Sequence, residues 1–579
     1  MAEHPFDNPA QLRSRMLSVV SRNGGHLASS LGAVEIAMAL ADVFDPERDR
    51  VVWDVGHQAY AWKLLTGRDG RFDTLRKLDG LSGFPNPAES PADAAVAGHA
   101  GVALSVALGL AAARDRKGTD ENVVAVVGDA AMANGVSLEA MNNCAAATGK
   151  VIVVLNDNEM SISRPTGSFA RLLGRLISGV RYNRVKLAAE KAGHALRLTF
   201  LRGIYHGLET RIKSLFLGNR FFEQFGLRYI GPVDGHDLGA LRAAFTVAKE
   251  DKRSVLVHVV TKKGHGYAPA EKNPTKWHGV GPFEIVPSEA SEKPAAPRRS
   301  WSDAFGDALL AAADRDSRVV ALTAAMKDGT GLDGFAKAHP SRFFDVGIAE
   351  EHMLAFAAGL AAGGMRPVVA VYSTFLQRAV DQVMHDVCLP NLPVVICVDR
   401  AGVVGADGAT HQGVFDVAML RCLPNLTICQ PKDEEDMKAL LDEALARKGP
   451  TVIRYPRGTV PAHVAPFGER GAKVAIWATG DWLAKAGEVA KAVGGCEVVH
   501  ARYLKPFDAG LLARQRAAGM KIVSLENGSA AGGLGEAIGA DMKFGWPDGF
   551  VPHGSQAELE KRFGLDAASV AGKIRSAYG

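Results

Sequence analysis

The chain has 579 residues, of which 47% are hydrophobic and 22% are charged, and its formal net charge is +4. This length exceeds what one hydrophobic core organises, so we expect about three domains. The small net charge gives no reason to expect nucleic acid or an anionic membrane as a partner. The six cysteines form no CxxC pair, which is typical of reduced thiols in the cytoplasm. No stretch of about 20 apolar residues that could span a membrane occurs.

Short apolar runs alternate with Ala- and Leu-rich helical stretches along most of the chain. Continuous apolar strands between helices are typical of parallel sheets that are covered on both faces. We therefore predict an α/β fold in which each domain has a mainly parallel sheet flanked by helices. The predicted strands are 123–128, 151–155, 254–261, 366–372, 392–399, 473–479 and 520–527.

Two breaks divide this pattern. The stretch VPSEASEKPAAPRRS at 286–300 is rich in Pro, Ser and charge and has the composition of a linker. A weaker break lies near 460–473. We predict a first domain at 1–285, a linker at 286–297, a second domain at 298–465 and a third at 470–579.

Two polar residues follow consecutive predicted strands of the first domain. Asp129 follows the strand at 123–128 and Asn158 follows the strand at 151–155, with a predicted helix from Asn134 to Ala145 between them. Ligands of parallel α/β sheets bind at the carboxyl ends of the strands, so these two side chains can converge. Carboxylate and amide oxygens suit Mg²⁺ that also holds phosphate oxygens, and a helix N-terminus favours the same anion. Taken singly, either residue is also typical of a helix cap or a turn.

The pattern GDA…NDN around these residues resembles the thiamine diphosphate fingerprint. Further stretches resemble 1-deoxy-D-xylulose-5-phosphate synthases, in order and over nearly the whole chain. They are NGGHLASSLG (23–32), WDVGHQAY (53–60), IGPVDGHD (230–237), KKGHGYAPAEKNP (262–274), DVGIAEEHMLAFAAGLA (345–361), YSTFLQRAVDQVMHDV (372–387), DRAGVVGADGATHQGVFD (399–416), RYPRG (454–458) and GFVPHGSQAELEKRFGLDAASVAGKI (549–574).

The resemblance implies a fold, a reaction and cofactors. The fold is the thiamine diphosphate-binding fold, with two domains of one type followed by a transketolase C-terminal-like domain, in a homodimer whose active site lies between the first two domains of one subunit. The reaction joins pyruvate to D-glyceraldehyde 3-phosphate with loss of CO₂. Its product, 1-deoxy-D-xylulose 5-phosphate, enters the methylerythritol phosphate route to isoprenoids and also serves thiamine synthesis. The implied cofactors are thiamine diphosphate and Mg²⁺.

The resemblance also implies which residues hold the cofactor. The implied metal ligands are two side chains and one backbone carbonyl, those of Asp129, Asn158 and Met160. The implied cofactor contacts come from both of the first two domains: His57, Gly98, His99, Gly128, Asp129, Ala130, Ala131, Asn158, Met160, Lys272, Glu350 and Phe375. Within this set, Phe375 matches the ring that stacks on the aminopyrimidine.

The resemblance implies proton-transfer roles for Glu350, His26, His411 and Asp407. Glu350, in IAEEH, matches the glutamate that faces N1′ of the aminopyrimidine. A buried carboxyl that bonds a ring nitrogen shares a proton with it, so we expect a raised pKa. Histidines carry protons readily near neutral pH, and His26 and His411 are expected to face the substrates.

The implied acceptor carries a phosphate dianion, which requires fixed positive charge. Arg400 and Arg457 match the family's phosphate-binding arginines, and arginine suits this task because its planar fork binds two oxygens. Tyr372 is expected nearby, and Arg378 is expected to support the site from behind.

Two alternatives remain open at this point. A transketolase-like or acyloin-forming enzyme with a different aldehyde acceptor would keep Asp129, Asn158 and Glu350 but would not need Arg400 and Arg457. A binding or regulatory protein without activity would be expected to lack Glu350 or Asp129, and the chain has both.

The chain departs from the family's usual sequence in two loops. The usual GHSSTS reads GHAGVA at 98–103, so that Gly101 stands where a serine is expected near the diphosphate. The usual GDGA(I/L)T(A/G)GM reads GDAAMANGV at 128–136. We expect the missing hydroxyl to weaken cofactor binding by about 0.5–1.5 kcal/mol.

Overall fold

The computed structural model describes residues 6–158, 168, 218–285, 299–461, 467–469 and 471–578. The predicted linker at 286–297 and the predicted ligand Met160 lie outside the described residues. The chain divides into two compact units, which are described separately below. Unit 1 comprises Met1–Leu75 and Leu81–Ala290, and unit 2 comprises Arg76–Gly80 and Ser291–Gly579.

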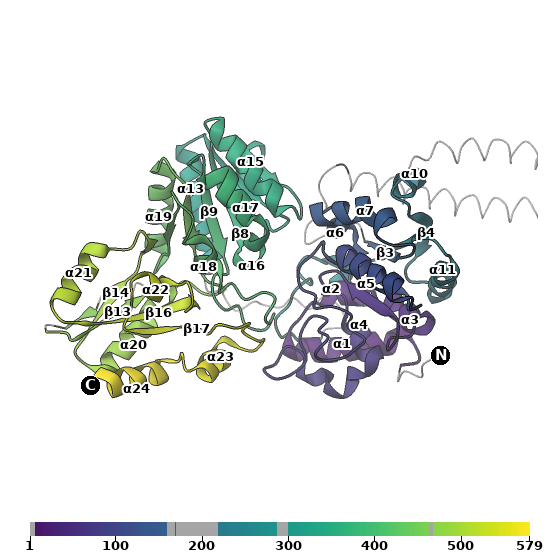
Figure 1. Cartoon of the computed structure of the whole chain (residues 1–579), viewed down its shortest axis with the longest axis horizontal. Coiled ribbons are helices and arrows are strands. Elements are labelled where there is room, and N and C mark those ends of the chain that lie inside the picture. Colours follow the sequence, from purple (N-terminus) through teal and green to yellow (C-terminus); the bar gives the residue numbers. More distant parts are fainter. Residues whose placement is uncertain are drawn as a thin grey trace, which may run out of the picture. The chain divides into compact units, whose positions relative to one another are not determined.

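The described part of unit 1 contains a five-stranded sheet with the order β1-β2-β3-β5-β4. Figure 1 labels β3 and β4 of this sheet. All neighbouring strands are parallel, so their carboxyl ends share one edge. The strands are β1 (Arg50–Trp53), β2 (Val123–Gly128), β3 (Ile152–Asp157), β4 (Arg228–Asp234) and β5 (Val255–Val260).

Helices cover both faces of this sheet, because successive strand residues point to opposite sides. Val124 and Val126 of β2 lie in a core with α3 and α11. Val123, Ala125 and Val127 of the same strand pack instead with α5 and α7. The helices of unit 1 are α1 (Pro9–Asn23), α2 (Leu27–Gly32), α3 (Val34–Val43), α4 (Tyr60–Lys63), α5 (Ala103–Lys117), α6 (Asp129–Met132), α7 (Gly135–Ala147), α10 (Gly218–Glu223), α11 (Leu238–Glu250) and α12 (Ala268–Lys272).

Over its described residues, unit 2 contains a seven-stranded sheet with the order β15-β10-β11-β9-β8-β6-β7. Its neighbouring strands are parallel except for the antiparallel pair β10 and β15. Phe305 of α13 and Leu440 of α19 cover one face, and Met353 and Leu354 of α15 cover the other. The strands are β6 (Val319–Thr323), β7 (Phe343–Asp345), β8 (Arg366–Tyr372), β9 (Val395–Asp399), β10 (Thr427–Cys429), β11 (Thr451–Arg454) and β15 (Tyr503–Lys505).

A second sheet of unit 2 has, among the described residues, the order β12-β14-β13-β16-β17. Trp477 and Ile522 of this sheet lie in the same core as α15, so the two sheets of unit 2 share buried apolar contacts. In addition, β15 comes from the C-terminal part of the chain but extends the seven-stranded sheet. The strands are β12 (Phe467–Gly468), β13 (Val474–Ala478), β14 (Cys496–His500), β16 (Lys521–Ser529) and β17 (Met542–Trp546).

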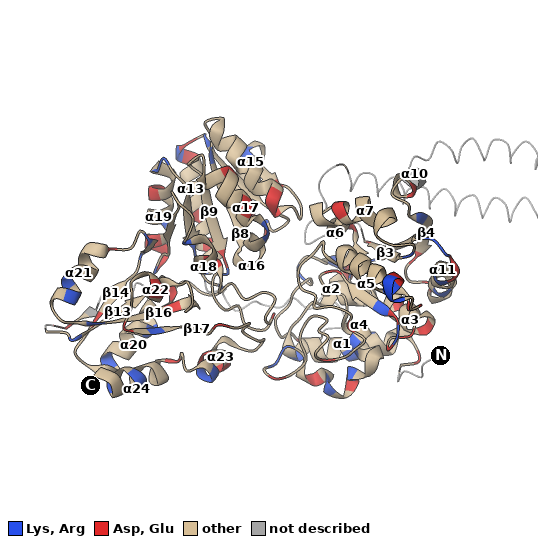
Figure 2. Ribbon diagram, viewed as in Figure 1, with Lys and Arg blue, Asp and Glu red and all other residues tan. Residues whose placement is uncertain are grey.

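The helices of unit 2 flank its two sheets. Figure 2 shows basic and acidic residues mixed along these helices. In the described part of the chain, no helix combines the length and apolarity that a membrane span requires. The helices are α13 (Trp301–Arg315), α14 (Asp333–Ala338), α15 (Glu350–Ala362), α16 (Ser373–Leu376), α17 (Val380–Gln382), α18 (Asp416–Leu420), α19 (Glu434–Ala446), α20 (Leu483–Val493), α21 (Ala509–Ala517), α22 (Leu534–Ala537), α23 (Gln556–Phe563) and α24 (Ala567–Tyr578).

A short segment, Arg76–Gly80, belongs to unit 2 although its neighbours in the chain belong to unit 1. Leu78 packs against the core of the C-terminal sheet. Asp79 binds Arg562 at 2.7 Å, and the Gly80 carbonyl lies 3.1 Å from Nε2 of His553. Arg76 and Asp79 have φ angles of 67° and 61°, a backbone conformation that non-glycine residues adopt only when surrounding contacts impose it.

The structure confirms the predicted α/β class and the mainly parallel sheets. Each predicted strand overlaps an observed strand, and the predicted helix between Asn134 and Ala145 is α7, with Asn134 as its N-cap. The predicted domain boundaries stay predictions.

Candidate active site

Asp129 and Asn158 lie at the carboxyl ends of the neighbouring strands β2 and β3. Gly128 pairs with Asn156 in the sheet, so the residues that follow them emerge from the same edge. Asp129 is the first residue of α6 and is 6% exposed. Ala130 lies inside this short helix, where alanine is a better residue than the glycine of the usual sequence.

The Asp129 carboxyl has a strongly perturbed charge state. Burial, together with the nearby charge of Asp157, raises its pKa to about 8, while Lys263 opposes this. Lys263 is itself 5% exposed, and burial lowers its pKa to about 8 against the attraction of Asp129. Two acids beside one buried lysine leave this edge of the sheet favourable for an additional cation.

A buried series of hydrogen bonds fixes the side chain of Asp157. Its Oδ2 lies 3.0 Å from Nε2 of His258, whose Nδ1 lies 2.7 Å from the Tyr229 hydroxyl. The adjacent Asn156 accepts a hydrogen bond from Thr261 at 2.6 Å. These contacts fix the end of β3, from which Asn158 follows.

The predicted cofactor residues Gly98 and His99 lie in the loop that leads into α5. Asp54, at the end of β1, anchors this loop, because its carboxylate accepts hydrogen bonds from the amides of Gly101 and Ala103 at 2.9–3.0 Å. Asp54 is 1% exposed, so the loop is fixed to the sheet at the edge where Asp129 lies.

Two predicted histidines of unit 1 lie in one cluster with His278. The ring centroid of His26 lies 6.1 Å from that of His57 and 5.7 Å from that of His278. Burial lowers the pKa of His278 well below its ordinary value, and the charges of Lys263, His57 and His26 lower it further. His278 is therefore neutral near pH 7. His411, the other histidine expected to face the substrates, belongs to unit 2, so a shared role with His26 stays a prediction.

Among the described residues, Glu35, His236 and His265 form a cluster with metal-ligand spacing. The Glu35 carboxylate already binds Arg13 at 2.7 Å and His236 at 3.2 Å. Nε2 of His236 accepts a hydrogen bond from the Lys262 amide at 2.8 Å. The guanidinium neutralises the acid and opposes a metal ion, so we interpret this cluster as a support for the loop that carries Lys263.

In unit 2, Glu350 is the first residue of α15 and is 4% exposed. Its Oε2 has no hydrogen-bond partner among the described residues. Burial raises the pKa of Glu350 to about 7, although Arg378 lowers it. Nη1 of Arg378 lies 3.7 Å from this oxygen, which agrees with the supporting role predicted for Arg378.

Aromatic rings lie at the end of β8. Phe375 stacks on Tyr372 with centroids 5.7 Å apart, and its edge meets the ring of His411 at 5.7 Å. The Tyr372 hydroxyl donates to the Gly329 carbonyl at 3.1 Å, and burial raises its pKa to about 12. The structure thus brings three predicted residues of unit 2 together.

The predicted phosphate arginines lie with them. The guanidinium of Arg400 is 4.0 Å above the Tyr372 ring, and Nη1 of Arg457 is 3.8 Å from Oδ2 of Asp407. Asp407 also binds Arg76 at 2.7 Å. Burial and the charge of Arg400 lower the pKa of Arg457. Arg76 was not predicted, and it brings a third positive charge to this group.

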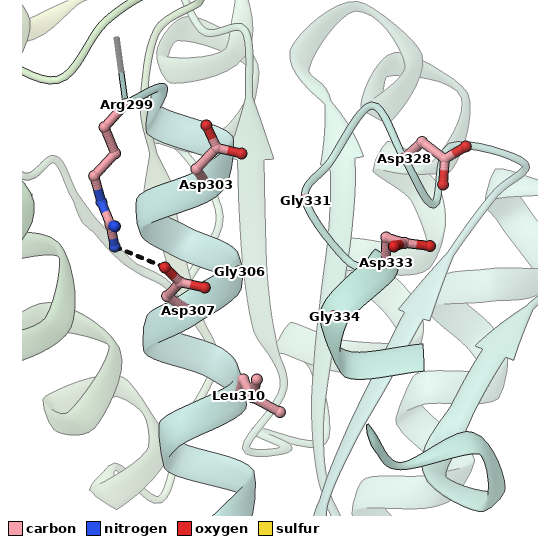
Figure 3. A pocket seen from close by; sticks show the side chains of 9 residues that line it. All are labelled: Arg299, Asp303, Gly306, Asp307, Leu310, Asp328, Gly331, Asp333 and Gly334. Atoms are coloured by element: carbon pink, nitrogen blue, oxygen red, sulfur yellow. Dashed lines mark hydrogen bonds and ion pairs between the residues drawn. The ribbon is translucent and has the colours of Figure 1, made fainter. Parts of the chain in front are cut away.

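Unit 2 also has a hollow of about 690 Å³ between α13 and the loop before α14, lined by four aspartates and Arg299 (Figure 3). Arg299 binds Asp307 at 2.8 Å, and Asp333 accepts from Lys327 at 2.9 Å. None of the predicted site residues lines this hollow, so we assign it no part in the reaction.

Comparison with known proteins covers nearly the whole chain. Residues 7–261 match the family model of 1-deoxy-D-xylulose-5-phosphate synthase. Residues 298–462 and 465–570 match the pyrimidine-binding and C-terminal domains of transketolase. 1-Deoxy-D-xylulose-5-phosphate synthase 2 of Geobacter sulfurreducens is 46% identical over 604 residues, covering 98% of this chain and 95% of its own. The chain belongs to the 1-deoxy-D-xylulose-5-phosphate synthase family.

A second synthase and a solved transketolase structure are also similar to nearly the whole chain. The 1-deoxy-D-xylulose-5-phosphate synthase of Desulforudis audaxviator is 45% identical over 585 residues, covering 96% of this chain and 92% of its own. The solved structure of transketolase from Campylobacter jejuni is 17% identical, with a TM-score of 0.45 and 98% of each chain covered; we draw nothing from so distant a likeness.

The transketolase-type domains imply dependence on thiamine diphosphate, and the residues present fit this cofactor. A buried carboxyl whose Oε2 has no hydrogen-bond partner in the described residues suits a ring nitrogen, and Glu350 is such a group. Asp129 and Asn158 offer the hard oxygen donors that a Mg²⁺-diphosphate prefers. The predicted cofactor contact Lys272 is exposed at the end of α12, whereas Lys263 of the same motif is buried beside Asp129. Burial therefore favours Lys263 over Lys272 as the lysine that contacts the cofactor.

Proposed function

We propose that this chain joins pyruvate to D-glyceraldehyde 3-phosphate, with loss of CO₂, to give 1-deoxy-D-xylulose 5-phosphate. We further propose that Asp129, Asn158 and the Met160 carbonyl bind Mg²⁺, which holds the diphosphate of thiamine diphosphate. The observation that carries the proposal is Glu350, a buried carboxyl whose pKa is raised to about 7. Family membership supports the same reaction.

When bound, thiamine diphosphate supplies the electron sink for decarboxylation. The protein's part is to orient the cofactor and to move protons. Glu350 is poised to share a proton with N1′ of the aminopyrimidine, because a carboxyl with a pKa near 7 both donates and accepts at neutral pH. Phe375 offers a ring face for stacking, and Arg378 limits how far the pKa of Glu350 rises.

The histidines and arginines serve the substrates. His26 of unit 1 and His411 of unit 2 are proposed to face the reacting carbonyl groups, and the neutral His278 beside His26 can accept a proton. In unit 2, Arg400 and Arg457 are proposed to bind the acceptor's phosphate, with Asp407 orienting Arg457. A site built from paired guanidinium groups favours a phosphorylated aldehyde over an uncharged one, which argues against an acyloin-forming enzyme with an apolar acceptor.

The test is a discontinuous assay of the full chain with Mg²⁺, thiamine diphosphate, pyruvate and D-glyceraldehyde 3-phosphate, in which CO₂ and the ketose phosphate are both quantified. Equal amounts of both products support the proposal. CO₂ without the ketose phosphate, or a ketose formed equally well from unphosphorylated glyceraldehyde, would contradict the proposed acceptor. Failure to consume pyruvate at saturating cofactor would contradict the activity itself.

A further inference from the structure

The two loops in which this chain departs from its family's usual sequence meet in the structure. One is the loop 98–103, in which Gly101 replaces a serine. The other is the turn before α7, in which Asn134 replaces an alanine or glycine. Gly101 and Asn134, two of the positions that differ in these loops, lie against each other at the edge of the sheet where Asp129 lies.

The backbone of Gly101 is fixed from two sides. Its amide donates to both carboxylate oxygens of Asp54 at 2.9 Å, and its carbonyl accepts from the Ser137 hydroxyl at 3.1 Å. Asp54 and Ser137 are buried. Gly101 has a φ of 87°, a conformation that a residue with a side chain adopts only with strain.

Asn134 fills the space next to Gly101. A Cβ atom on Gly101 would lie 2.3 Å from Oδ1, 2.6 Å from Cγ and 2.9 Å from Cβ of Asn134. Asn134 is 0% exposed, and its Oδ1 accepts from the Val136 amide at 3.0 Å. Because Asn134 is fully buried, a side chain at residue 101 would force Asn134 or the loop to shift.

We propose that Asn134 is a positioning residue for the cofactor loop 98–103. Its carboxamide occupies the volume that a side chain at residue 101 takes in the family's usual sequence, so the two departures are one coupled exchange. The inference rests on the proposed function, because it takes this loop to bind thiamine diphosphate. It also revises our expectation that the missing hydroxyl by itself weakens binding, since a serine restored at residue 101 alone would collide with Asn134.

Asn134 is also the N-cap of α7, so the test has to separate this capping role from its contact with residue 101. Glycine is nearly as good an N-cap as asparagine, so Asn134→Gly removes the side chain that contacts residue 101 and leaves the capping almost unchanged. Asn142→Gly is the matched control. It places glycine in the exposed middle of the same helix, where it weakens the helix more than at the cap without touching the loop.

The experiment measures thiamine diphosphate binding to the full chain by calorimetry in saturating Mg²⁺, with kcat at saturating cofactor as a second readout. The variants are Gly101→Ser, Asn134→Gly, their combination and the control. Neighbouring residues couple strongly, so we expect a loss of affinity of about 10-fold for Gly101→Ser and about 3-fold for Asn134→Gly. The double variant should lose clearly less than the product of about 30-fold, because Asn134→Gly relieves the collision at residue 101 but not the strain of its φ angle. Asn142→Gly lowers the melting temperature but leaves both affinity and kcat unchanged.

Three results would overturn the inference: the two single effects multiply in the double variant, Gly101→Ser binds as tightly as the parent, or Asn134→Gly leaves affinity unchanged. The last result needs no serine at residue 101, so the inference stays testable if Gly101→Ser does not fold. If the parent chain itself does not bind thiamine diphosphate, the proposed function and this inference fail together. If the parent binds and only the coupling is absent, the inference alone fails.

Discussion

Two buried carboxyl groups, Asp129 in unit 1 and Glu350 in unit 2, have pKa values raised mainly by burial, to about 8 and about 7. Their surroundings differ. A second acid, Asp157, and the buried Lys263 both lie near Asp129, so two acids face one lysine and the local charge favours a cation. A guanidinium, Arg378, stands 3.7 Å from Glu350, so a metal ion is disfavoured and a proton is the natural partner. Under the proposed function, the same burial thus prepares Asp129 for a metal ion and Glu350 for a proton.

The largest expected effect comes from removing the proton site. Glu350→Gln keeps the size of the side chain but cannot share its proton, so we expect kcat to fall by about 10²–10⁴-fold. Thiamine diphosphate affinity, measured by calorimetry in saturating Mg²⁺, should change little by comparison. Glu351→Gln, at the partly buried neighbour, is the matched control and should keep its activity. A Glu350→Gln variant that turns over at the parent rate would remove the central argument for catalysis.

The reverse pattern is expected for the metal site. Asp129→Asn removes a charged ligand, and even an outer-shell change at a metal site weakens metal binding by about 10–100-fold. We therefore expect thiamine diphosphate affinity in Mg²⁺ to fall by at least about 100-fold, with partial recovery of the rate at high Mg²⁺. Glu139→Gln on the exposed face of α7 should bind normally. Unchanged affinity in Asp129→Asn would mean that the two acids do not differ as argued.

The sequence predicted Asp129 and Glu350 as site residues. The neighbours that it missed depend on contacts between residues that lie far apart in the chain. Runs such as 123–128 are apolar on both faces, and the residues that follow them must reach the ligand edge, which is how Asp129 was found. The resemblance supplied Glu350. Arg76 could not be found in this way, because its partner Asp407 lies 331 residues away. Lys263 and Lys272 share one motif, and only the fold shows which of them is buried.

The proposed phosphate-binding arginines of unit 2 allow a third test, which concerns the acceptor D-glyceraldehyde 3-phosphate. Arg457→Gln removes one charged donor from the group around Asp407, and a hydrogen bond to a charged group contributes about 1.5–3 kcal/mol. Because Arg457 remains partly exposed, we expect the lower end, a rise of about 10-fold in the KM for D-glyceraldehyde 3-phosphate. The KM for pyruvate should not change, and unphosphorylated glyceraldehyde should be used no worse than by the parent. Equal losses for both aldehydes would mean that Arg457 does not bind the phosphate.

The last expected effect is on stability rather than on catalysis, as a pH dependence in the absence of cofactor. The folded state raises the pKa of Glu350 from 4.5 to about 7 and so prefers its protonated form. This contribution to stability is complete below the unfolded pKa and is lost as the pH rises through about 7. The free energy of unfolding of the parent, relative to Glu350→Gln, should therefore fall by about 1 kcal/mol per pH unit between pH 5 and pH 7 and then level off.

Thermal melts of both proteins at several pH values measure this difference. Mg²⁺ alone should leave it unchanged, because Glu350 with its neighbouring guanidinium does not attract a cation. Melting temperatures that stay parallel across the range would show that burial does not hold the proton on Glu350. A difference that disappears on adding Mg²⁺ would show that this carboxyl binds metal, and the two acids would then be alike rather than opposed.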